Sequence, residues 1–180
     1  GAEYDSLSDM ISFGAAPALV IYEWALKDMG KMGWIAAFIY CTCAALRLAR
    51  FNSKTGETDR RFFQGLPSPA AAALIAGLVW VMLEFKIAGP DIKWLAWGIT
   101  VFAGFTMVSN LPYYSGKEIN LRKSVPFITV LLLALFFFVL IPSQPPVVLF
   151  CVFMLYALSG YIMWILQWRK KKKSTAIQES

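Results

Sequence analysis

Two aspartates in the first nine residues have the type and spacing to bind a metal ion. Asp5 and Asp9 lie four residues apart in GAEYDSLSD, and Gly1 precedes Asp5 by four. On a helix these three positions share one face. Two carboxylates there suit a hard divalent cation such as Mg²⁺ or Mn²⁺, and Gly1 would leave room for a bulky ligand. The alternative is that the acids only complement the positive end of a helix dipole.

Two arginines form a second group with chemical potential. Arg47 and Arg50 lie three residues apart in ALRLARFN, so they share one side of a helix. The planar guanidinium matches phosphate and carboxylate, and an arginine near hydrocarbon is costly enough to indicate a functional site. The alternative is that both arginines anchor the end of a membrane span by snorkelling.

The elements that must position these residues are membrane helices. The sequence is 58% hydrophobic and 16% charged, whereas soluble domains average about 45–50% apolar and about 25% charged. Lipid offers the backbone no hydrogen-bond partners, so each span must be helical. The predicted fold is an all-α, polytopic membrane helical bundle. Six segments approach or reach the required length of about 20 residues: 10–27, 33–51, 66–85, 93–111, 125–142 and 146–168.

The distribution of basic residues predicts the orientation of this bundle. With a cytoplasmic N-terminus and six spans, thirteen of the seventeen Lys and Arg residues lie on the cytoplasmic side and four on the opposite side. Asp5, Asp9, Arg47 and Arg50 then share the cytoplasmic face. We expect a transmembrane catalytic domain over residues 1–168 and a basic cytoplasmic tail over 169–180. Such a tail is typical of the end of a span and does not indicate nucleic-acid binding.

Two residue types limit the chemistry further. The sequence has no histidine, so acid–base roles fall to carboxylates, Tyr, Lys or Cys. Cys41, Cys43 and Cys151 all lie within apolar runs and are interpreted as small buried side chains rather than as a disulfide or metal pair. Metal-bound carboxylates beside arginines at a membrane face indicate phosphoryl chemistry on a lipid.

The spacing Gly1-x-x-x-Asp5-x-x-x-Asp9 resembles the second half of the CDP-alcohol phosphatidyltransferase signature, D-x-x-D-G-x-x-A-R, a spacer, then G-x-x-x-D-x-x-x-D. Four further stretches resemble one branch of this family, the bacterial-type integral-membrane phosphatidylserine synthases. They are SLSDMISFGAAPA at 6–18, ALRLARFN at 45–52, FFQGLPSPAAA at 62–72 and MVSNLPYYSGKEI at 107–119. The first half of the signature is absent. In the family it ends the second of eight spans, so we expect that two spans are missing here and that residues 1–180 alone are inactive.

The resemblance implies a role for each matching residue. Asp5 would bind the divalent metal, Mg²⁺ or Mn²⁺, that holds the CDP pyrophosphate, and Gly1 would pack near the cytidine. Asp9 would be the general base and would also touch the metal. The residues implied on the acceptor side are Arg47, Arg50, Asn52, Gly65 and Pro67. Asn110, Tyr113 and Tyr114 are weaker candidates, which we interpret instead as interface aromatics with a polar cap.

The implied reaction transfers a phosphatidyl group from CDP-diacylglycerol to L-serine and releases CMP. The resemblance also implies a homodimer in a bacterial inner membrane, with the active site facing the cytoplasm. An acceptor such as glycerol 3-phosphate or inositol stays open, because the acidic motif does not distinguish alcohols. A small-molecule transporter and a structural membrane protein are further alternatives. A transporter is disfavoured because the polar residues gather at one face rather than near the midplane.

Overall fold

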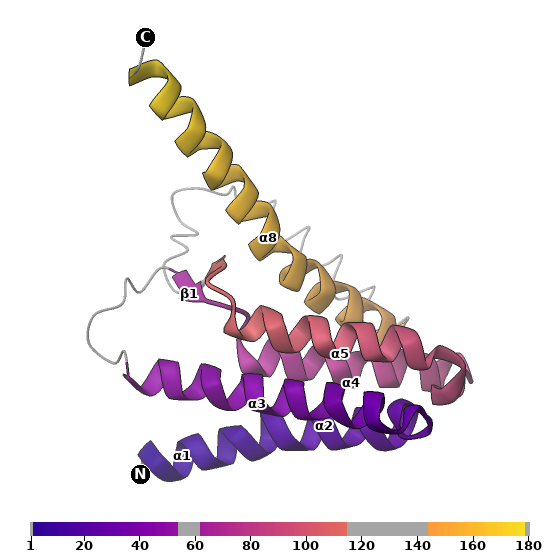
Figure 1. The fold of residues 1–180 in the computed structure, drawn as a ribbon. Helices are drawn as coiled ribbons and strands as arrows, with labels where there is room; N and C mark the ends of the chain where they lie inside the picture. The colour runs from indigo at the N-terminus through magenta and orange to yellow at the C-terminus, as the bar shows by residue number, and fades with distance from the viewer. Residues whose placement is uncertain (1, 54–61, 115–143, 179–180) are drawn as a thin grey trace, which may run out of the picture.

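A computed structural model describes residues 2–53, 62–114 and 144–178, which form a bundle of long helices (Figure 1). The first helical rod combines α1 (Ala2–Asp9), η1 (Met10–Ala15), α2 (Ala16–Ile21), η2 (Tyr22–Leu26) and η3 (Lys27–Met29). Two of its segments, η1 and η2, are π-helical, a form that occurs mostly as short insertions within α-helices. Gly30 ends the rod, and α3 (Lys31–Ser53) runs back beside it.

The rest of the described chain adds helices and one short ribbon. The helices are α4 (Ser68–Glu84), η4 (Gly89–Ile92), α5 (Lys93–Val108) and α8 (Pro145–Gln178). The strands β1 (Phe62–Gln64) and β2 (Pro112–Tyr114) pair antiparallel, with Phe62 opposite Tyr114. This two-stranded ribbon is the one departure, in the described ranges, from the all-helical fold that the sequence predicts.

Helices coincide with five of the six predicted apolar segments, and the sixth, 125–142, lies outside the described residues. Two helices, α3 and the Pro145–Ile165 part of α8, are long and apolar enough to cross a membrane, whereas the apolar helix α4 is shorter. The backbone of α8 continues past the predicted boundary at residue 168 into the basic tail. The described residues are therefore mostly helical and include two candidate membrane spans, as expected of a helical membrane protein.

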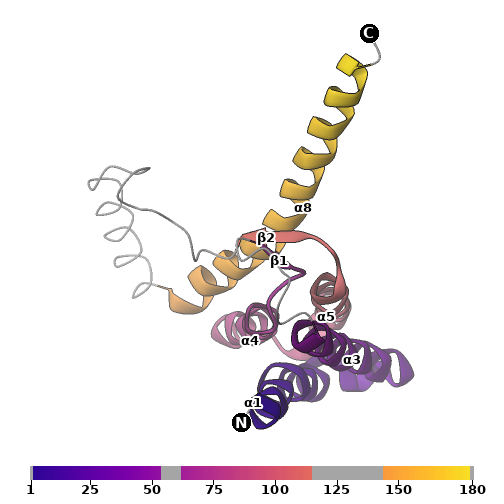
Figure 2. The ribbon, with the colours of Figure 1, turned by 90° about the vertical axis from the view of Figure 1, so that its left-hand side faces the viewer.

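Small side chains let the helices approach closely. The pairs α3 with α5 and α4 with α8 pack against each other, and the first rod lies against α3 and α4 (Figure 2). Packing of small residues drives helix association where lipid weakens the hydrophobic effect. Buried alanines accordingly recur along the interfaces: Ala18, Ala25, Ala36, Ala44, Ala70, Ala71, Ala72, Ala96, Ala103 and Ala157.

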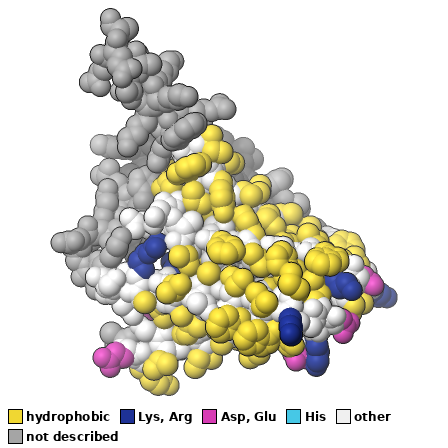
Figure 3. Space-filling view, viewed as in Figure 1, with side chains coloured by type: hydrophobic (Ala, Val, Ile, Leu, Met, Phe, Trp, Pro, Cys, Tyr) yellow, Lys and Arg dark blue, Asp and Glu magenta, His cyan; other side chains and the backbone are white. Residues whose placement is uncertain are grey.

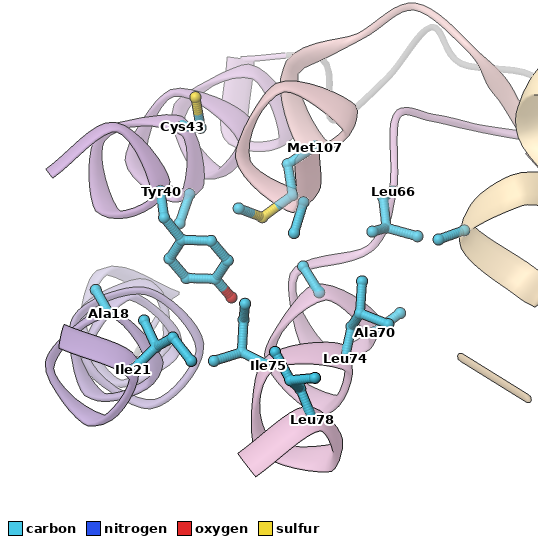
Figure 4. Close-up of a cluster of buried hydrophobic side chains, with 14 of the residues drawn as sticks. Ala18, Ile21, Tyr40, Cys43, Leu66, Ala70, Leu74, Ile75, Leu78 and Met107 are labelled. Carbon is cyan, nitrogen blue, oxygen red and sulfur yellow. The ribbon is translucent and has the colours of Figure 1, made fainter. Parts of the chain in front are cut away.

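A few large side chains fill the centre of the bundle. Tyr40 of α3 lies between Ile21 of α2 and Ile75 of α4, and Met107 of α5 closes the cluster (Figure 4). The phenol of Tyr40 donates a hydrogen bond to the Phe13 carbonyl in η1 over 3.0 Å. A polar group is therefore satisfied inside the core, as buried hydroxyls require.

The face of the bundle seen in Figure 3 is mainly apolar between two ends that carry charged side chains. Large exposed hydrophobic residues include Leu19, Phe38, Trp80 and Phe105. At one end of the bundle, Lys27 and Glu23 form an exposed ion pair of 2.7 Å. The opposite end, where α1 begins and α3 ends, carries the aspartates and arginines singled out in the sequence.

Candidate active site

The two aspartates occupy α1 as the sequence predicts. Asp5 is exposed and Asp9, the last residue of α1, is half-buried directly before the π-helical η1. Because α1 is a regular helix, the two carboxylates lie on one face of it. Gly1, the first residue of the motif, lies outside the described residues. Asp9 interacts electrostatically with Arg47 of α3, which brings the acidic and arginine motifs together at one end of the bundle.

Arg47 is held by α4. Its Nη1 donates to the Ser68 hydroxyl oxygen at 2.6 Å, and the side chain is half-buried. The Nε of Arg47 is buried and has no hydrogen-bond partner within the described residues. Buried guanidinium donors are usually all paired in a purely structural role. An unused donor beside Asp9 therefore suits a site that receives an anionic ligand.

Arg50 points to a different helix from Arg47. Its Nη1 donates to the Val108 carbonyl at 2.9 Å and to the Asn110 side-chain oxygen at 3.1 Å. Val108 ends α5, and a cation at a helix C-terminus complements the negative end of the dipole. Asn110 thus orients Arg50 in this structure.

Asn52 links the end of α3 to the start of the first rod. Its Nδ2 donates to the Ser6 hydroxyl oxygen at 2.9 Å, and Ser6 directly follows Asp5 in sequence. The contact is exposed, at the same end of the bundle as Arg50. Asn52 therefore lies next to the acidic helix as well as at the end of the arginine helix.

Gly65 and Pro67 shape the chain before α4. Gly65 has a φ of +79° and is buried, and a Cβ there would overlap the Met107 carbonyl oxygen. Its N–H donates to the Leu111 carbonyl at 2.9 Å. Pro67 immediately precedes α4, and its carbonyl accepts from the Ala71 N–H at 3.0 Å. Both residues have backbone roles here, and their predicted contact with an acceptor stays a prediction.

The interpretation of Tyr113 as an interface aromatic is wrong. Tyr113 is completely buried, and its phenol donates to the Ala157 carbonyl of α8 at 2.6 Å. Burial raises the pKa of Tyr113, so the phenol stays protonated as a donor. The strand β2 turns this ring inward against α8, which hydropathy alone does not reveal. The side chain of Tyr114 is outside the described residues. Asn110 is exposed, and its side-chain oxygen accepts a hydrogen bond from Arg50.

Three neighbours of the site residues were not predicted from the sequence. Ser68 pairs with Arg47, Ser6 pairs with Asn52, and Tyr156 of α8 interacts electrostatically with Arg47. Ser68 had a usable signal, because a serine between two prolines before an alanine run is typical of a helix start. Ser6 and Tyr156 had none, since their partners are far away in the sequence.

The donor chemistry of Asp5 and Asp9 fits a divalent cation. Carboxylate oxygens are the ligands that Mg²⁺ and Mn²⁺ prefer, and Asp5 is exposed to a ligand. In the described ranges, no group of three or more His, Cys, Asp or Glu residues lies together. The two aspartates would thus supply part of a metal's ligand set.

Comparisons with known proteins identify a common family. The family model for CDP-alcohol phosphatidyltransferase matches residues 1–105. A CDP-diacylglycerol–serine O-phosphatidyltransferase of Helicobacter pylori (strain J99) is 35% identical over 166 residues, which are 92% of this chain and 68% of the relative. One of the same name from Mycobacterium leprae is 32% identical over 141 residues, 76% of this chain and 47% of the relative. An archaetidylserine synthase of Methanothermobacter thermautotrophicus is 36% identical over 113 residues, 63% of this chain and 44% of the relative.

Proposed function

We propose, from the premise that this chain belongs to the CDP-alcohol phosphatidyltransferase family, that it acts in phospholipid biosynthesis as a CDP-diacylglycerol–serine O-phosphatidyltransferase. The observation that carries this is the Helicobacter pylori relative of that name, whose similarity extends over 92% of the chain. The enzyme transfers a phosphatidyl group from CDP-diacylglycerol to L-serine and forms phosphatidylserine and CMP. Family membership assigns an enzyme and sets the transporter and structural alternatives aside.

The reaction is a direct displacement at phosphorus. The serine hydroxyl oxygen forms a bond to the phosphatidyl phosphorus, the bond from that phosphorus to the CMP oxygen breaks, and CMP leaves. Asp9 accepts the serine hydroxyl proton as general base. Its half-buried position at the end of α1 and its interaction with Arg47 support this role.

Positive charge at the same end of the bundle receives the anionic groups. Arg47 binds the serine carboxylate or a phosphate, with its unpaired Nε in support of that role. Arg50 and Asn52 line the acceptor side, where their contacts to α5 and to Ser6 hold them. Gly65 and Pro67 set the backbone that borders this region.

The family is generally dependent on a divalent metal. We assign Mg²⁺ or Mn²⁺ to Asp5 and Asp9, because their carboxylates share one helix face. When bound, the cation would supply countercharge for the CDP pyrophosphate. Gly1 would lie beside the cytidine, and its absent side chain leaves space for the nucleotide.

The membrane arrangement is also a proposal. Six spans with both termini in the cytoplasm of a bacterial inner membrane put the active site on the cytoplasmic face, which the strong asymmetry of basic residues supports. The enzyme acts as a homodimer and takes both lipid and serine at this face. Single cysteines at Glu3 and Asp28 of an otherwise cysteine-free protein test the orientation with a membrane-impermeant thiol reagent. In intact cells the cysteine at 28 should react and the one at 3 should not, and the reverse pattern would overturn the orientation.

An acceptor panel tests the proposed reaction. Membranes containing the complete natural protein receive CDP-diacylglycerol, Mg²⁺ or Mn²⁺ and one alcohol, and CMP release is followed. We expect CMP with serine and about 10²- to 10⁴-fold less with Asp9→Asn, while Asp28→Asn at the opposite end keeps the full rate. If CMP is released only with glycerol 3-phosphate or inositol, that alcohol and not serine is the acceptor. A normal rate for Asp9→Asn would overturn the assignment of Asp9 as general base.

A further inference from the structure

Arg47 lies where three helices contribute to one environment. It projects from α3 and donates to Ser68 at the start of α4 over 2.6 Å. Ser68 is only 5% exposed, so water competes little for this hydrogen bond. From α8, Tyr156 interacts electrostatically with the same guanidinium. The hydrogen bond to Ser68 of α4 therefore restrains the orientation of Arg47, and Tyr156 of α8 contributes to its electrostatic environment.

The backbone before α4 determines where the Ser68 hydroxyl lies. The N–H groups of Gly65 and Leu66 donate to the Leu111 and Thr106 carbonyls at 2.9 and 3.1 Å. These bonds fasten the segment to the end of α5 and to the residues after it. Gly65 fits there because its φ is +79° and a Cβ would overlap Met107. Ser68 thus comes from a rigid segment.

The ring of Tyr156 is held in place by its packing against strand β2. Its ring packs against the buried Tyr113 at a centroid distance of 5.4 Å. Tyr113 in turn donates to the Ala157 carbonyl at 2.6 Å, and a Cβ at Gly160 would overlap the Tyr113 ring. The ribbon strand β2 and α8 are therefore locked together beside Tyr156.

We propose that Ser68 and Tyr156 are positioning residues that orient the Arg47 guanidinium toward the acceptor. The proposal rests on the proposed function, because it takes Arg47 as the group that binds the serine carboxylate. Tyr156 lies in α8, beyond the residues 1–105 that match the family model. The acceptor site thus includes a helix outside the matched segment, and a planar bidentate group such as Arg depends strongly on its orientation.

Kinetics of Ser68→Ala and Tyr156→Phe in the complete natural protein test this proposal. Both variants remove a hydroxyl and keep the surrounding packing. We expect the KM for serine to rise about tenfold, equivalent to about 1.4 kcal/mol, with the KM for CDP-diacylglycerol little changed and the thermal midpoint lowered no more than by loss of another buried hydrogen bond. Neither change should add to the effect of Arg47→Ala when the substitutions are combined, because residues that act through one group are not additive.

Two matched controls separate positioning from general stability. Tyr161→Phe, also in α8, removes the 2.8 Å bond between the Tyr161 phenol and the Thr106 hydroxyl of α5. Ser159→Ala removes the 2.7 Å bond from the Ser159 hydroxyl to the backbone carbonyl of Tyr156 and keeps the Tyr156 phenol. Both should keep the serine KM, although Tyr161→Phe lowers the thermal midpoint. An unchanged serine KM in Ser68→Ala and Tyr156→Phe, or full additivity with Arg47→Ala, would overturn the proposal.

The acceptor assay on the unaltered protein distinguishes failure of the proposed function from failure of the positioning proposal. If this protein releases no CMP with serine but does so with another alcohol, the proposed acceptor fails, and the KM for that alcohol then tests positioning. If the unaltered protein turns serine over normally and both variants have the same KM for serine, only the positioning proposal fails and the proposed function stands.

Discussion

The phenol of Tyr40 donates to the carbonyl of Phe13 over 3.0 Å, and this hydrogen bond joins the middle of α3 to the π-helical η1. Asp9 lies directly before η1, and Arg47 lies two turns beyond Tyr40 on α3. The contact therefore connects the helix that carries the aspartates to the helix that carries the arginines. Replacing Tyr40 with Phe keeps the ring but leaves the Phe13 carbonyl without this donor.

We expect Tyr40→Phe to lower the free energy of unfolding by about 1–3 kcal/mol, the cost of leaving a buried polar group unpaired. Thermal or denaturant unfolding in detergent measures this change. Tyr4→Phe is the control, because Tyr4 is 80% exposed and should change stability little. Equal stability of the two variants would contradict a structural role for the Tyr40 hydrogen bond.

Gly65→Ala should destabilise the protein by more than about 1 kcal/mol, because the added Cβ meets both a left-handed backbone and the Met107 carbonyl. Gly98→Ala on α5 is the matched control. A Cβ at Gly98 meets no atom within 4 Å, and alanine there removes the helix cost of glycine, about 0.5–1 kcal/mol. Unfolding measurements should show opposite signs for the two substitutions, and equal effects would refute the close approach at Gly65.

Arg50→Lys should lower stability by about 1.5–3 kcal/mol, because the lysine nitrogen ends one bond short of Nη1, the one atom that donates to both the Val108 carbonyl and the Asn110 side chain. Asn110→Ala should have a smaller effect, since the Val108 carbonyl still accepts from Arg50. Lys31→Gln, an exposed residue at the opposite end, serves as the comparison. The thermal unfolding midpoints of the three variants check the role of the Arg50 hydrogen bonds. A larger loss of stability for Asn110→Ala than for Arg50→Lys would be inconsistent with that role.

A chelator should stop CMP release, and Mg²⁺ or Mn²⁺ should restore it if Asp5 and Asp9 hold the metal. Asp5→Asn should then raise the half-saturating metal concentration by at least about tenfold, because a carboxylate ligand is lost. Glu3→Gln removes an exposed acid from the same helix without altering the proposed pair. A metal titration of both variants measures this difference. An unchanged titration in Asp5→Asn would exclude Asp5 as a ligand.

Local properties of the chain accounted for the helices and for the chemical character of one end of the bundle. Hydropathy located segments 33–51 and 146–168, which correspond to α3 and α8. The four-residue spacing of Asp5 and Asp9 correctly predicted a helical face, since helical periodicity is set within a few residues. The family signature likewise lies within short stretches of sequence and was recognisable there.

The partners of these residues were decided only by packing between distant segments. Arg47 and Arg50 are equivalent by spacing, yet one contacts α4 and the other contacts the end of α5. The sequence suggests that Tyr113 is an interface residue, but the pairing of β1 with β2 directs its ring toward α8. Sequence alone therefore determined which groups are available and on which helices they lie. Only the tertiary structure decided which of them meet, because contacts across the bundle depend on how whole helix surfaces fit together.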